Sequence, residues 1–301
     1  AVTGRTPTTA IDYGDFPALY RAADSNSLSG QRRYLRTTRL QLGSLVAAAL
    51  FGLFGWHAGR TDIASVLAAV AFASALVSEI YLLKERPDRQ WYTGRAVAES
   101  TKTLTWRYMV GGSPLGVETV DRGSADALLL DRFADIEADV QPLWLIPDEG
   151  APGQITAAMA LTRGLPLDER RDFYLKHRIN DQLDWYRRKA RWNARAATRW
   201  SVTLAVLELV GLAAGIARAA GMVEVDLMGF AAALAAAGTA WVQAKQHQNL
   251  ATAYAVTGHE LSAISARMPS APSESAWASF VADAEEAISR EHTLWRASHG
   301  G

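Results

Sequence analysis

The chain has 301 residues, of which 49% are hydrophobic and 21% are charged, and its formal net charge is zero. A zero net charge removes the usual electrostatic basis for nucleic-acid binding. The absence of cysteine excludes disulfides, thiolate metal sites and cysteine nucleophiles. These averages hide a strong segregation, because long charge-free runs separate highly charged segments.

The N-terminal segment, residues 1–27, is predicted to be a flexible tail with a short helix. Its first residues are polar, so we expect no cleavable signal peptide. The rest divides into a first two-transmembrane unit with a cytoplasmic helix (28–110), a cytoplasmic connector (111–166), and a second two-transmembrane unit with a long helical stalk and a C-terminal helix (167–301).

Four charge-poor runs, 40–59, 63–83, 200–217 and 227–244, each have the length of a membrane helix. A soluble bundle is the alternative, but four such runs would need a very large core for this chain length. The runs pair into two hairpins. We therefore predict an all-α integral membrane protein with two transmembrane helical hairpins, extended by long cytoplasmic helices.

Basic residues are distributed unevenly around the four runs. Clusters of Lys and Arg precede the first and third runs and follow the second, whereas the two hairpin tips carry only Arg60 and Arg218. The positive-inside rule then predicts a multi-pass protein with cytoplasmic N- and C-termini.

Long helices are predicted to continue the membrane hairpins. Residues 168–217 contain no proline and no glycine before Gly211, which permits one helix of about 50 residues. Pro87 should break the helix that follows the second run, and a new helix should cover 88–108. Further predicted elements are helices at 124–140, at 154–163 and from Ser273, and a short strand at 143–146.

The two halves follow the same plan, in which a basic aromatic helix enters a hairpin and a polar helix leaves it. An offset of 160 residues aligns Arg39 with Arg199 and Gly55 with Gly215. The shared order of elements indicates an internal duplication.

Glu208 lies at the middle of the third run, where an unshielded carboxylate costs at least about 2.5 kcal/mol. At helical spacing it shares a small, polar face with Ser201, Gly211 and Gly215, which predicts an inward orientation. The Gly211–Gly215 spacing suits either packing within one hairpin or subunit association. Glu208 itself could line a water-filled path, donate a hydrogen bond as a neutral acid, or pair with a base, although no Lys or Arg lies at its depth.

Other acidic and polar residues form weaker candidates. Glu79, with Ser78 beside it, could face a pore, or it could reach the interface and pair with Arg86. Glu224 and Asp226 could form an acidic ring at an outer mouth, or simply end the hairpin helices.

A basic, aromatic stretch precedes the third run. Because it leads directly into a membrane helix, we predict contact with anionic lipid headgroups rather than with nucleic acid. Its candidate residues are Arg187, Arg188, Lys189, Arg191, Arg195 and Arg199.

No sequence pattern indicates catalysis. The Walker A, dinucleotide-binding, zinc-protease and nucleophile-elbow motifs are missing, and the six histidines have no metal-ligand spacing. We therefore predict a non-enzymatic protein without catalytic residues, cofactor or metal.

Three motifs resemble the SLATT family, the SMODS- and SLOG-associating two-transmembrane effector domains. They are WYTGRAVAESTKTLTWRY (91–108), QIT (154–156) and LPLDERRDFYLKHRINDQLDWYRRKARWN (165–193). The resemblance covers nearly the whole chain as two units in tandem. It implies a bacterial inner-membrane effector with antiphage function, whose trigger is a separate sensor protein or a nucleotide-type signal.

The leading hypothesis is thus a homo-oligomeric pore or ion channel that is gated through its cytoplasmic helices, with membrane lipids as further partners. The alternative is a non-conducting scaffold or a partner subunit of a larger complex. A proton-coupled transporter is a third hypothesis, but the sequence offers no substrate site.

Overall fold

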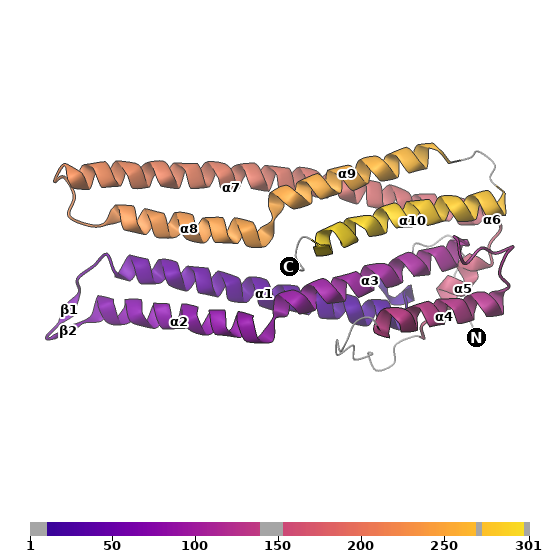
Figure 1. The fold of residues 1–301 in the computed structure, drawn as a ribbon, viewed down its shortest axis with the longest axis horizontal. Coiled ribbons are helices and arrows are strands. Elements are labelled where there is room, and N and C mark those ends of the chain that lie inside the picture. Colours follow the sequence, from indigo (N-terminus) through magenta and orange to yellow (C-terminus); the bar gives the residue numbers. More distant parts are fainter. Residues whose placement is uncertain (1–10, 139–152, 269–272, 298–301) are drawn as a thin grey trace. The chain divides into compact units, whose positions relative to one another are not determined.

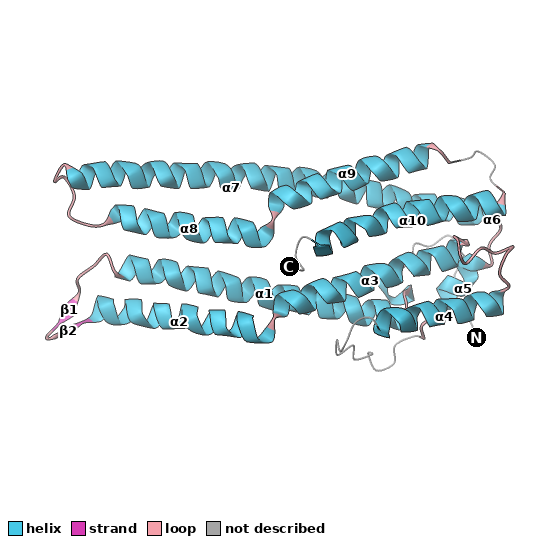
Figure 2. Cartoon of the chain, in the orientation of Figure 1, coloured by secondary structure: helices cyan, strands magenta, loops and turns pink. Residues whose placement is uncertain are grey.

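The computed structural model describes residues 11–138, 153–268 and 273–297, which are almost entirely helical (Figures 1 and 2). The predicted strand at 143–146 and the first ten residues of the predicted tail lie outside these ranges. A short 3-10 turn, η1 (Tyr13–Asp15), precedes the first helix.

The first half of the chain forms one long helix, a hairpin tip and three shorter helices, the last of which lies in the connector. In chain order these are α1 (Ala18–Phe51), β1 (His57–Ala58), β2 (Thr61–Asp62), α2 (Ile63–Glu85), α3 (Pro87–Val110) and α4 (Arg122–Ala138). The helix predicted at 88–108 is thereby confirmed as α3, and the described part of the helix predicted at 124–140 is confirmed as α4.

The predicted membrane helix over 40–59 is wrong in its last part. Helix α1 ends at Phe51, and His57–Ala58 pairs with Thr61–Asp62 as an antiparallel hairpin. Glycines at 52, 55 and 59 explain the early end, and Gly59 closes the hairpin turn with a φ of 65°. The helical part of the run is then only roughly 18 Å long, shorter than the hydrocarbon core.

Three described helical segments remain long and apolar enough to cross a membrane. They lie within Ile63–Val110, Leu167–Ala219 and Leu227–Ala266. The structure therefore supports an all-α membrane protein with three clear spans, rather than the four that we predicted.

The second half contains the long helix predicted from residue 168. Its elements are α5 (Ala157–Arg163), α6 (Leu167–Tyr174), the π-helical segment η2 (Leu175–Asn180), α7 (Asp181–Ala219), α8 (Leu227–Lys245), α9 (His247–Ala266) and α10 (Glu274–Ala297). Ser273 caps α10 as predicted, because its hydroxyl accepts a hydrogen bond from the Ala276 amide at 3.3 Å.

The same break occurs in both halves. Arg86 ends α2 with a φ of 44°, and Gln246 ends α8 with a φ of 51°, both in the left-handed region. The two positions differ by the offset of 160 residues that aligned the halves. Pro87 predicts the first break, but the sequence around Gln246 carries no comparable signal, so its break was not predicted.

The chain divides into two compact units. The core unit comprises Ala1–Ser29, Arg89–Ala190 and Thr252–Gly301, and the hairpin unit comprises Gly30–Asp88 and Arg191–Ala251. Four helices, α1, α3, α7 and α9, contribute residues to both units.

An aromatic cluster lies at the centre of the core unit. The ring of Trp106 lies 6.5, 6.0 and 5.8 Å from those of Phe16, Phe173 and Tyr174, measured between centroids. Tyr174 in turn meets Trp277 of α10 edge-on at 5.7 Å, and both of these side chains are fully buried. The cluster joins three helices, α3, α6 and α10, and the segment before α1.

Two of the family-like motifs hold this unit together. The Gln154 side-chain carbonyl accepts a hydrogen bond from the Leu19 amide at 3.1 Å, and Thr156 caps α5 while donating to the Asp15 carbonyl at 2.6 Å. At Gly94, an added Cβ would lie 2.9 Å from the Ser27 amide nitrogen. Glycine therefore permits the close approach of α1 and α3.

Helices α7 and α9 pack on each other within the core unit. Tyr254 of α9 lies 5.0 Å from Trp185 and 6.0 Å from Tyr186 of α7 between ring centroids, and Tyr254 and Tyr186 are buried.

Candidate functional site

The α7–α8 seam uses the predicted glycine pair. An added Cβ at Gly211 would lie 3.2 Å from the Cβ of Ala231, and one at Gly215 would lie 2.7 Å from the sulfur of Met228. Both partners belong to α8 of the same chain. The spacing therefore serves packing within one hairpin, as the first of the two alternatives proposed.

Glu208 lies beside this seam and not in it. Its side chain is exposed in the single chain, and the structure records no ion pair or hydrogen bond for it among the described residues. Ser201, two turns earlier, is also exposed, and its hydroxyl donates to the Ala197 carbonyl at 3.0 Å. The predicted common face is thus divided, because the glycines contact α8 while Glu208 and Ser201 remain accessible.

The polar residues of α2 have partners within their own hairpin. Ser78 is buried and donates to the Ser74 carbonyl at 2.9 Å, while the Ser74 hydroxyl lies 3.2 Å from that of Ser44 on α1. Glu79 is exposed. Its proposed partner Arg86 lies 3.6 Å from Asp88 instead.

The two acidic residues at the second tip differ in their contacts. The Asp226 carboxylate lies 2.7 Å from the Arg218 guanidinium and caps α8 by accepting from the Gly229 amide at 3.2 Å. Asp226 therefore has a local role in ending the hairpin. Glu224 is exposed.

The basic residues of α7 are exposed. All six predicted lipid-contact residues are accessible, whereas Asn193 and Ala197 between them, and Tyr186 directly before them, are buried. The Arg187 guanidinium lies 3.5 Å from the Asp184 carboxylate, and both side chains of this pair are exposed. The stretch is therefore a helix with one packed side and a broad cationic surface.

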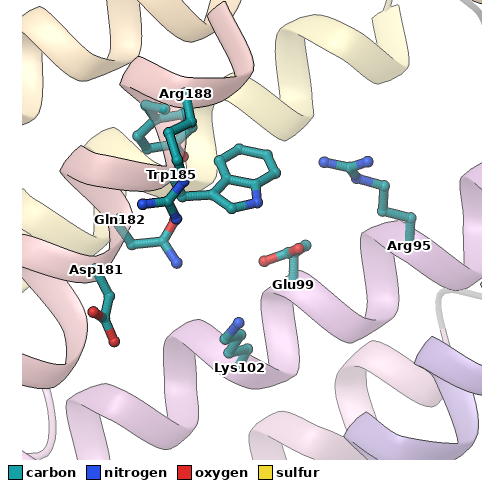
Figure 3. Close-up of a pocket in the computed structure, with 8 residues that line it drawn as sticks. Arg95, Glu99, Lys102, Asp181, Gln182, Trp185 and Arg188 are labelled. Carbon is teal, nitrogen blue, oxygen red and sulfur yellow. The ribbon is translucent and has the colours of Figure 1, made fainter. Parts of the chain in front are cut away.

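The core unit contains a polar cavity of about 470 Å³ that was not predicted (Figure 3). Charged and aromatic side chains of α3 and α7 line it: Arg95, Glu99, Lys102, Asp181, Gln182, Trp185, Tyr186 and Arg188. The three α3 residues belong to the motif at 91–108 and recur at spacings of four and three, so they share one helix face. That spacing is the sequence signal from which the α3 side of the cavity could have been predicted.

Lys102 is a half-buried charge that lines this cavity. Its ammonium nitrogen lies 5.9 and 5.8 Å from the ring centroids of Phe16 and Tyr20. Burial lowers the pKa of Lys102, and the positive charge of Arg178 acts in the same direction, while Glu99 opposes them. Aromatic faces stabilise a cation in such a place.

A buried ion pair lies close to the aromatic cluster. Arg178 of η2 contacts the Glu285 carboxylate of α10 through two nitrogens at 2.8 and 2.7 Å, and the Tyr174 hydroxyl donates to the same carboxylate at 2.9 Å. Arg178 and Glu285 are almost completely inaccessible. The bidentate pair fixes α10 against the π-helical segment, a kind of helical irregularity that often occurs at functional sites.

A metal site is not apparent in the described part of the chain. Among residues 11–138, 153–268 and 273–289, no group of three or more His, Asp or Glu side chains lies close enough to hold an ion.

Both halves of the chain match models of one protein family. Residues 17–171 match SMODS and SLOG-associating 2TM effector domain 3, and residues 174–295 match SMODS and SLOG-associating 2TM effector domain 1. The chain belongs to the SLATT family. Its two SLATT units stand in tandem, as the motifs predicted, and the boundary between them falls at the end of α6.

The family describes two-transmembrane effector domains associated with bacterial conflict systems. This SLATT protein is therefore a membrane protein with an effector role. No curated protein and no solved structure matches its sequence.

Proposed function

We propose that this SLATT protein assembles from identical copies into an ion-conducting pore in the bacterial inner membrane. Exposed Glu208, in the apolar half of α7, is the observation on which the proposal rests. A carboxyl group at this depth is stable only against protein, water or a bound proton.

A second copy could supply the surface that the single chain lacks. Glu208 lies on an exposed strip with Ser201, Ala205 and Leu212, spaced by three and four residues. The strip is mostly small and polar. A neighbouring surface of α7 carries Val202, Val206 and Leu209, which are 58, 52 and 65% exposed and suit lipid. Association along the strip would surround the carboxyl groups with protein and place them together, where they would favour cations.

The proposed topology follows from the charge distribution. Arg187, Arg188, Lys189, Arg191, Arg195 and Arg199 would contact anionic lipid on the cytoplasmic side, and both termini would lie in the cytoplasm. The hairpin tips, which carry few basic residues, would face outward.

Gating would operate through the cytoplasmic core unit. The shared helices α1, α3, α7 and α9 provide a covalent route from this unit to the membrane hairpins. A separate sensor protein or a nucleotide-type signal is the proposed trigger. Any trigger that alters the packing of α3 on α7 would be transmitted along two of these helices.

Ion flux through liposomes containing the purified full chain tests the proposal. We expect wild-type protein to pass cations in preference to anions, and Glu208→Gln to reduce that preference, which reversal potentials in planar bilayers would measure. Glu85→Gln removes the same charge just outside the α2 span and should leave the preference unchanged.

Two results would overturn the proposal of a pore. One is a disulfide cross-linking experiment with Ala205→Cys that detects no contact between copies in membranes. The other is an assembled oligomer without flux whose Glu208→Gln variant behaves as wild type, and this result would establish a non-conducting scaffold instead.

A further inference from the structure

Two cations from different repeats converge on one tryptophan in the hairpin unit. The guanidinium carbon of Arg39, from α1, lies 4.9 Å from the centroid of the Trp241 ring on α8. The ammonium nitrogen of Lys245, one turn further along α8, lies 5.4 Å from the same centroid. No sequence motif connects Arg39 with Lys245.

These cations have no recorded acidic partner. Among the described residues, no ion pair involves Arg39 or Lys245, and the positive charge of Arg39 acts against the charged form of Lys245. The indole ring stabilises each cation, but it does not neutralise either of them. A bound anion would relieve their repulsion.

Their position relative to the apolar runs indicates which anion is available. Arg39 directly precedes the run that begins at Leu40, and Lys245 directly follows the run that ends at Ala244. Both side chains therefore lie at the same end of the hairpins, beside a tryptophan of the kind found at membrane interfaces. Lipid phosphates occupy this level of a bilayer, and basic sites between membrane helices bind anionic headgroups.

A small open pocket adjoins these residues in the chain. It has a volume of about 270 Å³ and surrounds the left-handed break after α8, where the next residues supply amide and imidazole groups. Its lining residues are Val242, Gln243, Gln246, His247, Gln248 and Asn249. Such groups can hydrogen-bond a phosphate ester or a headgroup hydroxyl.

We propose that Arg39 and Lys245 bind the phosphate group of an anionic phospholipid at Trp241. The lipid holds α1 of the first SLATT unit to α8 of the second by bridging their cations. This site differs from the basic stretch of α7, which covers a broad surface and involves neither residue. The proposal requires insertion in a membrane, but it does not depend on conduction.

Native mass spectrometry of the purified full chain in a mild non-ionic detergent tests the site. Dioleoylphosphatidylglycerol is the anionic probe, dioleoylphosphatidylcholine is the zwitterionic probe, and inorganic phosphate is the soluble competitor. We expect tighter binding of the phosphatidylglycerol. Arg39→Gln and Lys245→Gln should each weaken it by about fivefold, the effect of one near-surface charge.

Two variants control for general charge and for folding. Arg36→Gln removes an exposed charge one turn earlier on α1 and should keep wild-type affinity. Arg39→Lys keeps the charge and should retain most of the binding. Circular dichroism and the elution volume identify any variant that has lost its fold.

Three results would overturn the proposal. Equal affinity for the two lipids would remove the anionic selectivity. Unchanged phosphatidylglycerol binding in both glutamine variants would assign the lipid to the α7 stretch. Complete displacement of the lipid by millimolar inorganic phosphate would show that the cations bind a free anion.

Discussion

The core unit and the hairpin unit bury opposite kinds of side chain. In the core unit, Trp106, Tyr174, Trp277 and Leu129 are at most 3% exposed. In the hairpin unit, every buried hydrophobic residue among those described is an alanine, as at Ala64, Ala75, Ala197, Ala231 and Ala251. The large aliphatic and aromatic side chains of that unit face outward instead.

This difference shows that two solvents shape one chain. In water, folding is driven by burying large apolar groups, so a unit that exposes them would not be stable there. In lipid those groups need no burial, and helices associate through small residues that let their backbones approach. The contrast is independent physical support for placing the hairpin unit in a membrane.

The largest expected effect concerns the buried charges of the core unit. Arg178→Ala leaves Glu285 buried without its bidentate partner, which should lower the free energy of unfolding by about 3–5 kcal/mol. Arg187→Ala breaks only the exposed pair with Asp184 and should cost at most about 1 kcal/mol. Thermal unfolding followed by circular dichroism compares the two. Similar losses would mean that α10 is not fixed by the buried pair.

A matched leucine truncation compares the two units directly. Leu129 of α4 is completely buried, so Leu129→Ala should cost about 2–5 kcal/mol. Leu209 of α7 is 65% exposed, so Leu209→Ala should change stability by no more than about 0.5 kcal/mol in detergent. Denaturation in the same detergent provides both values. A large loss at Leu209 would indicate a protein contact on the surface that we assign to lipid.

The smallest expected effect is a pH dependence in the core unit. Burial raises the pKa of Asp24, because it disfavours the carboxylate, while a hydrogen bond with Tyr13 partly opposes the shift. The folded state therefore binds the Asp24 proton more tightly than the unfolded state. Protonated Asp24 therefore contributes to the free energy of unfolding. This contribution is complete below the unfolded pKa of Asp24, near 3.8, and is lost as pH rises through the higher folded pKa.

The variant Asp24→Asn should remove this dependence. We expect the unfolding temperature of wild type to decline relative to that of the variant as pH rises above about 4. Differential scanning calorimetry at several pH values measures the difference. If the unfolding temperatures of the two proteins changed in parallel with pH, this result would contradict the raised pKa of Asp24.

Much of the fold could be predicted because its signals are local. Apolar runs, Pro87 and the Ser273 cap depend on neighbouring residues, and each predicted the element that forms there. The run from Leu40 misled us, because its composition suits a membrane helix while its glycines end the helix at Phe51. The break at Gln246 has no such local signal.

The candidate sites were less predictable, since they depend on which faces meet. Glu208 was identified from the cost of a charge in an apolar run, but only the packing of α7 on α8 shows that the glycines occupy the seam and leave the carboxyl group outside it. The cavity around Lys102 and the Arg178–Glu285 pair join residues far apart in the chain. The periodicity of a single segment does not predict contacts between residues of distant segments.

The sequence by itself determined that this is a helical SLATT membrane protein of two tandem units, because hydropathy and motif order are properties of the linear chain. Only the tertiary structure decided where helices end in left-handed breaks, which charges are buried in pairs, and which cations from separate repeats share a tryptophan. Those features arise from contacts between distant segments, whose energies depend on distance in space and not on separation along the chain.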